Sequence, residues 1–171
     1  MGSVRALTIF TAILAAVAAT SAERAAAQTI PALTVPSVQT PLPLDPHADP
    51  AAWSDAAVAQ LPWDVQHNRG SSEPATARIA TDGKNLYVRF DVQQRETLLA
   101  QQHANDVGDG TDDEVWIDLW PSGANGFYYQ FAATSNGTHY QYSSENTAYA
   151  PTWESHGTAV AGGMIASTFL N

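Results

Sequence analysis

The chain has 171 residues, 44% of them hydrophobic, with five Trp, six Tyr, five Phe and no Cys. This length and composition predict one globular domain with a sizeable core, and they exclude disulfides, thiol catalysis and cysteine-ligated metal centres. The 17 acidic residues against 7 Lys and Arg give a formal net charge of -10, which excludes a surface that neutralises nucleic-acid phosphates.

Residues 1–27 have the pattern of an export signal. The basic Arg5 precedes an apolar run over residues 6–20, and the alanines at 25–27 offer a cleavage site. An uncleaved anchor is the alternative, but the run is shorter than the ~20 residues that span a bilayer, and Glu23 follows it closely. We therefore expect a secreted or periplasmic protein with no membrane span after cleavage of the signal peptide.

A Pro-rich stretch follows the signal. Six prolines lie between residues 28 and 50, a spacing that forbids a helix and favours an extended, polyproline-like backbone. We therefore predict a linker over residues 28–43 and the folded domain over residues 44–171.

Helical patterns are short and few. One helix is predicted over residues 50–60, where Asp49 can cap the N-terminus and Pro50 suits the first turn. A second short helix is predicted over residues 95–104. The remaining sequence is typical of strands and turns.

The strand pattern predicts an all-β fold. Residues 76–81 and 85–92 flank Asp82-Gly83, a dipeptide typical of hairpin turns. Further strands, with Asn136-Gly137 as a second turn, are predicted at residues 114–120, 127–134, 138–143, 153–160 and 164–170. Such spacing predicts an Ig-like antiparallel β-sandwich. The last predicted strand coincides with the end of the chain, so a truncated sandwich is one interpretation.

The segment 105–114 carries five carboxylates on a Gly-containing loop. Clustered oxygen ligands suit Ca²⁺, and this makes Ca²⁺ the candidate cofactor. The alternatives are a solvated Asp- and Gly-rich turn, or an acid/base pair of a glycosidase formed by Asp113 with Glu114 or by Asp112 with Asp118. The candidate metal ligands are Asp106, Asp109, Asp112 and Asp113.

Aromatic residues are the stronger functional lead. Trp116, Asp118 and Trp120 alternate with Ile117 and Leu119 in one predicted strand, so the two sets lie on opposite faces of it. We expect Ile117 and Leu119 to face the core. The other face then belongs to a second packed layer or lines a ligand surface, where aromatic rings suit stacking on sugars.

Several stretches, taken in order, resemble the family 9 carbohydrate-binding modules and their DOMON-like relatives. They cover most of residues 44–170 and comprise residues 49–53, 61–63, 76–90, 112–119 and 126–131, with Asn136-Gly137 and Trp153. The resemblance implies an Ig-like, DOMON-like β-sandwich that binds sugars, often with calcium, beside xylan-degrading hydrolases. The final segment, 163–171, departs from the family pattern because it lacks the Ile-Pro-hydrophobic run of the closing strand.

The resemblance also implies a sugar site. Family members sandwich a terminal sugar between paired tryptophans, and on this chain the pair would be Trp116 or Trp120 with Trp153, with Tyr128 as a further carbohydrate-binding residue. We therefore predict a secreted or periplasmic carbohydrate-binding module, an accessory of glycoside hydrolases in carbohydrate catabolism. Its partner would be a polysaccharide or oligosaccharide, and it would have no catalytic activity of its own.

The sequence is also compatible with four other functional classes. One alternative is part of a hydrolase acting on O-glycosyl bonds. Another is the N-terminal periplasmic domain of an outer-membrane protein, of which this chain would be a fragment. A haem-binding DOMON-like domain is a third, with Met164 and a histidine as axial ligands. A periplasmic interaction domain without a small ligand is the fourth.

Overall fold

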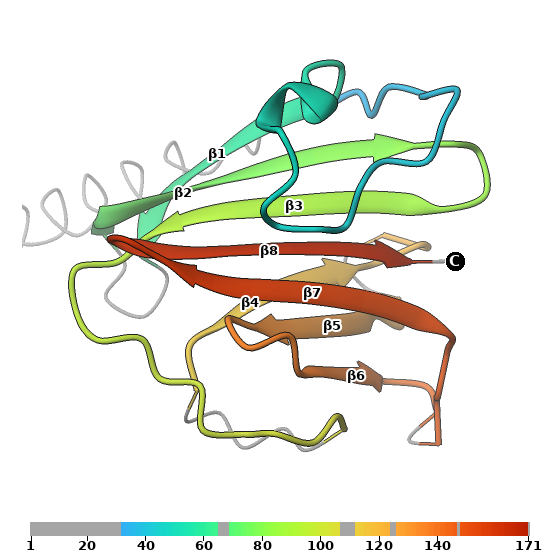
Figure 1. The fold of residues 1–171 in the computed structure, drawn as a ribbon. Helices are drawn as coiled ribbons and strands as arrows, with labels where there is room; N and C mark the ends of the chain where they lie inside the picture. Colours follow the sequence, from blue (N-terminus) through green and yellow to red (C-terminus); the bar gives the residue numbers. More distant parts are fainter. Residues whose placement is uncertain (1–31, 65–68, 107–111, 124–125, 147, 171) are drawn as a thin grey trace, which may run out of the picture. The chain divides into compact units, whose positions relative to one another are not determined.

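The computed structural model describes residues 32–64, 69–106, 112–123, 126–146 and 148–170. The predicted signal peptide therefore lies outside the described residues. The chain divides into two compact units, Met1–Leu33 and Thr34–Asn171, and the second unit contains the β-structure (Figure 1).

Two antiparallel sheets make up this unit, as the strand pattern predicts (Figure 1). The first has five strands in the order β1 (Ala57–Asp64), β2 (Arg69–Thr81), β3 (Leu86–Gln93), β8 (Gly163–Leu170) and β7 (Trp153–Val160). The second has three strands in the order β4 (Glu114–Leu119), β5 (Tyr129–Thr134) and β6 (His139–Ser143). The prediction of an all-β antiparallel sandwich is confirmed.

The predicted hairpin around Asp82-Gly83 joins β2 to β3. Asp82 Oδ1 accepts the backbone N–H groups of Lys84 and Asn85 at 2.9 and 2.7 Å, and Oδ2 accepts the Tyr87 hydroxyl at 2.7 Å. These hydrogen bonds hold the pKa of the Asp82 carboxyl well below its usual range, and the backbone N–H of Asn85 makes the largest contribution. Gly83 has a φ of 87°, which favours glycine. The turn therefore specifies the register of the hairpin.

The core lies between the two sheets. Its main cluster contains buried side chains of β2, β3 and β8 together with Val115 of β4 and Ala133 of β5. A neighbouring cluster combines Phe131 of β5 with Trp153 of β7 and Leu170 of β8. Both clusters draw on both sheets, so burial of apolar surface holds the sandwich together.

The other face of the five-stranded sheet is covered by the chain before β1. Val38, Leu42 and Leu44 pack on a buried cluster that includes Trp53 and Tyr87. Residues 36–38 also bond to β2, because the Val38 N–H donates to the Thr81 carbonyl at 2.8 Å and the Thr81 N–H to the Pro36 carbonyl at 3.0 Å. The extended residues from 34 to 43, predicted as linker, are thus packed against the domain.

Neither predicted helix forms as expected. Asp49 caps a helix beginning at Pro50, as predicted, but it is a 3-10 helix that ends at Trp53, and strand β1 begins at Ala57. Pairing of Ala57 and the next residues with β2 replaces helical hydrogen bonds. Over residues 95–104 the backbone is irregular, because several of its N–H groups donate to carboxylates instead of to carbonyls four residues back.

Strand β8 lies inside its sheet, paired with β3 on one side and with β7 on the other. The edges of this sheet are β1 and β7.

The two sheets are in close backbone contact where β7 passes the β5-β6 hairpin. A Cβ on Gly157 would lie 2.0 Å from the Thr134 carbonyl oxygen and 3.1 Å from the Gly137 nitrogen. Beside this contact, Ser155 Oγ lies 3.3 Å from the Gly137 carbonyl oxygen and 3.2 Å from Nδ1 of His139. Only glycine permits this backbone approach, so Gly157 sets the spacing between the sheets here.

Replacing Gly157 by alanine tests this contact. Because the new methyl would overlap backbone atoms, we expect Gly157→Ala to lower the free energy of unfolding by about 1–3 kcal/mol, the usual cost of overpacking. Urea unfolding, monitored by Trp fluorescence, measures this change in the free energy of unfolding. Gly70→Ala in β2 is the matched control, since its Cβ would have its nearest heavy atom 4.0 Å away. Equal stability of the two variants would contradict the assignment.

Candidate functional site

The three-stranded sheet presents a tryptophan-bearing face to solvent. In β4, Val115 is buried and Ile117 packs against the core, whereas Trp116 in the strand and Trp120 directly after it are 41% and 44% exposed. The prediction that Trp116 and Trp120 lie opposite the core side of this strand is confirmed. They line an open surface and do not enter a second packed layer.

Strand register adds two tyrosines to this surface, and a ring contact adds Tyr128. Trp116 lies level with Ala132 of β5 and through it with Tyr140 of β6, and Asp118 lies level with Gln130 and Tyr142. Tyr128, just before β5, contacts Trp120. We call this surface the aromatic face and define it by Trp116, Trp120, Tyr128, Tyr140 and Tyr142.

The rings of the aromatic face form two bands. The first band runs from Trp120 to Tyr128 to Tyr142, with successive ring centroids 5.5 and 5.8 Å apart and tilts of 36° and 46°. The second band is Trp116 with Tyr140, whose centroids are 6.2 Å apart in an edge-to-face arrangement of 73°. The small, buried Ala132 lies between these two residues in the sheet. These spacings lie within the range of favourable aromatic pairs.

Polar groups interrupt the aromatic face, and they are neutral or acidic. Asp118 is exposed and Gln130 is half-buried beside it. Residues 114–120, 128–134 and 138–144, which contain the three strands, include no Lys or Arg. The surface thus offers aromatic rings, hydroxyls, an amide and a carboxylate, a set suited to a ligand that is both apolar and hydroxylated.

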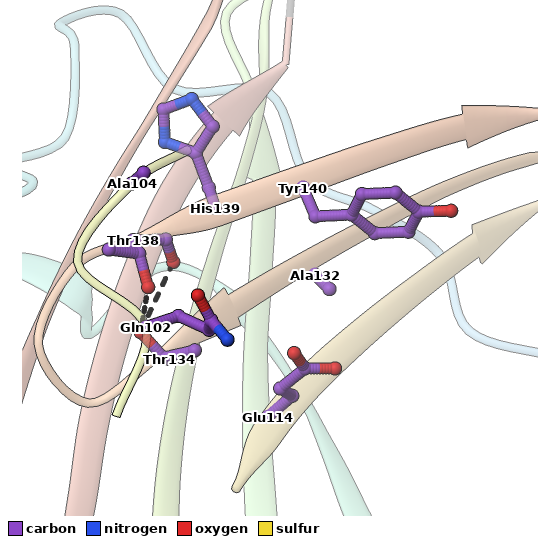
Figure 2. Close-up of a pocket in the computed structure, with 8 residues that line it drawn as sticks. All are labelled: Gln102, Ala104, Glu114, Ala132, Thr134, Thr138, His139 and Tyr140. Atoms are coloured by element: carbon purple, nitrogen blue, oxygen red, sulfur yellow. Dashed lines mark hydrogen bonds between the residues drawn. The ribbon is translucent and has the colours of Figure 1, made fainter. Parts of the chain in front are cut away.

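A small hollow marks one end of the aromatic face, beyond Tyr140. Figure 2 shows Gln102 beside Thr134 and Thr138, with Glu114 nearby. The hydroxyls of Thr134 and Thr138 lie 2.7 Å apart. The hollow has a volume of about 10 Å³, which is room for about one water molecule. It is too small to enclose a sugar ring.

Two of the predicted metal ligands anchor the segment that borders this hollow. Asp112 accepts the backbone N–H groups of Gln101 and Gln102 at 2.8 and 2.9 Å, one on each carboxylate oxygen. Asp113 Oδ2 accepts the Leu99 N–H at 2.7 Å and the Gln94 side-chain amide at 2.9 Å. These carboxylates replace helical hydrogen bonds in the segment, and this role explains why acidic residues occur here.

The other two predicted ligands do not complete a metal site in the described chain. Asp106 accepts the Gln141 side-chain amide at 2.6 Å, and Asp109 lies outside the described residues. Within the ranges that the structure covers, no group of three or more His, Asp or Glu is arranged to hold a metal ion. Calcium binding by Asp106, Asp109, Asp112 and Asp113 stays a prediction.

Two residues singled out from the sequence are buried in the core and not on the aromatic face. Trp153 is 6% exposed, packs edge-on against Phe131, and donates its indole N–H to Gln141 Oε1 at 2.8 Å. The structure therefore does not bring Trp153 together with Trp116 or Trp120. Met164, the proposed haem ligand, is 2% exposed within the main core cluster.

The structure also adds residues that the predicted site lacked. Tyr140, Tyr142 and Gln130 share the aromatic face with Trp116 and Trp120 only because β5 and β6 pair in this register. The alternation of Tyr140 and Tyr142 within one predicted strand is the sequence signal for two of them. The pairing partner of each strand is not readable from one sequence.

Comparisons of the chain with family models, with curated proteins and with solved structures find no match. The resemblance drawn from the sequence therefore stays a resemblance, and the functional argument depends on the aromatic face. Along the described parts of the chain, no helix has the length and apolar character needed to cross a membrane.

His139 lies under the same sheet, next to the ring of Trp153 at 4.5 Å between centroids. Burial lowers the pKa of its imidazole below the usual 6.5, and the nearby Asp106 charge opposes this only in part. The folded state thus holds His139 neutral at a pH where the unfolded chain binds a proton.

A pH dependence of stability follows from this burial. Below pH 6.5 the unfolded state gains a proton that the folded state resists, so the free energy of unfolding falls as the pH falls from 7 toward the lowered pKa. We expect His139→Gln to flatten this decline, as measured by urea unfolding at a series of pH values. The control is His156→Gln, because the His156 side chain is 52% exposed. A decline as steep in the His139 variant as in the unchanged protein would contradict the prediction.

Proposed function

We propose that this chain is a carbohydrate-binding β-sandwich domain that acts outside the cytoplasm, accessory to carbohydrate catabolism and without catalytic activity of its own. The observation that carries the proposal is the aromatic face, where two exposed tryptophans and three half-buried tyrosines gather on one sheet surface. The proposal of export depends on the signal-peptide pattern of residues 1–27. The intact mass of the mature protein tests it, because cleavage would remove these residues.

Exposed aromatic surface of this kind needs a functional reason. Large apolar side chains are usually buried, and contiguous exposed ones mark binding sites. Trp116 and Trp120 remain 41% and 44% exposed although each contacts a tyrosine ring. Flat rings cover the apolar C–H face of a sugar, while Asp118 and Gln130 are placed to hydrogen-bond its hydroxyls.

The acidic residues of segment 105–114 support binding better than hydrolysis. A glycosidase needs two carboxylates facing one cleft. Asp112 uses both oxygens for backbone N–H groups, and Asp113 uses one oxygen for two donors. Their hydrogen bonds shape the segment beside the aromatic face.

Calorimetric titration with xylan- and cellulose-derived oligosaccharides, followed in parallel by Trp fluorescence, tests the proposal. We expect saturable binding with a shift in fluorescence. Trp120→Ala should weaken it about tenfold or more, which corresponds to ~1.4 kcal/mol, because it removes one ring of a stacking surface.

The matched control is Val58→Ala, which truncates a 49% exposed side chain on the five-stranded sheet. It should leave the affinity unchanged. Repeating the titration with a chelator tests the calcium prediction separately. Absence of binding to every glycan by a folded sample would overturn the proposed function and favour an interaction domain.

A further inference from the structure

Within the described residues, both tryptophans of the aromatic face are exposed. Trp116 lies in β4 and Trp120 directly follows its last residue, Leu119, so the two tryptophans are four residues apart, which spans at most about 13–14 Å at the rise of an antiparallel strand. The hollow beyond Tyr140 holds only about 10 Å³. With Trp153 in the core, no second tryptophan in the described chain closes over Trp116 or Trp120 to enclose a terminal sugar.

A polar row lies between the two tryptophans. Asp118 and Gln130 lie side by side in register, and Tyr142 of the first band continues the row on β6. A ligand that stacks on both Trp116 and Trp120 must therefore pass over the hydrogen-bonding groups of this row. A chain of linked sugars has this pattern, because each ring offers an apolar face and hydroxyl edges.

The charge of the surface selects against acidic chains. Glu114 and Asp118 belong to this face of β4, the three strands contain no Lys or Arg, and the whole chain has a formal net charge of -10. A polyuronate would be repelled. A second copy of this chain docked face to face would bring the Asp118 carboxylates toward like charges, which disfavours self-association through this surface.

We infer that the aromatic face binds along the flank of an extended, uncharged glycan chain, contacting both bands with interior sugars and leaving the chain ends free. This inference rests on the proposed function. It differs from capture of a terminal sugar between paired tryptophans, the mode that the family resemblance implies.

A length series of one neutral oligosaccharide, from the monosaccharide to the hexasaccharide, tests the inference by calorimetry. We expect weak or no binding of the shortest ligands and at least a tenfold gain in affinity once the chain spans both bands. Trp116→Ala should abolish most of this gain, because it removes the second band, while the first band still binds short chains. Val58→Ala is again the control, and it should keep the full length dependence.

Two further ligands separate the binding modes. A hexasaccharide whose reducing end has been converted to an alditol should bind as well as the untreated one, because interior sugars make the contacts. A polygalacturonate chain should bind at least tenfold more weakly than a neutral chain.

The possible failures are distinguishable. Saturable binding that is independent of chain length, or that is lost on reduction of the chain end, would overturn flank binding and leave the proposed function standing. Absence of binding at every length would overturn both. A concentration-dependent dimer that Trp116→Ala converts to a monomer, measured by light scattering, would make the face an interface between copies and overturn the inference.

Discussion

The architecture depends on the close approach of β7 to the β5-β6 hairpin at Gly157. There the two sheets are in backbone contact, and the neighbouring Ser155 and Trp153 add hydrogen bonds to the hairpin and to β6. At this junction, one face of the three-stranded sheet packs against the core. The opposite face, which carries Trp116, is left to solvent, so exposure of the aromatic face follows from the way the sheets are joined.

Strand β3 is buried on both faces of the five-stranded sheet. The side chains of Val88 and Phe90 enter the core, but Tyr87 and Arg89 are buried too, because residues 34–56 cover their face. Arg89 keeps its charge compensated by Asp91, with Nε 3.3 Å from the carboxylate. Because the segment before β1 covers the outer face of β3, this strand buries side chains on both of its faces.

The sequence predicted correctly those features that depend only on residues close together in the chain. The turn at Asp82-Gly83 needs only its own neighbours, and the alternation around Trp116 identifies the solvent side of β4 because period two is intrinsic to strands. Residues 50–60 and 95–104 escaped prediction because their hydrogen-bond partners are distant in sequence, in β2 for one and at Asp112 for the other. Trp153 illustrates the same limit, since its burial depends on Phe131 and Leu170 from other strands.

The position of β8 between β3 and β7 also constrains how the domain forms. Its partner β3 ends about 70 residues earlier in the chain, at Gln93 against Gly163. Pairings between residues so far apart require closure of a long loop before they contribute any contact energy, and they slow folding. The β1-β3 meander can form early, but the sheet becomes continuous only when β8 inserts beside it. The rate at which the complete sheet forms therefore depends on the pairing of β8 with β3 and not on the local β1-β3 meander.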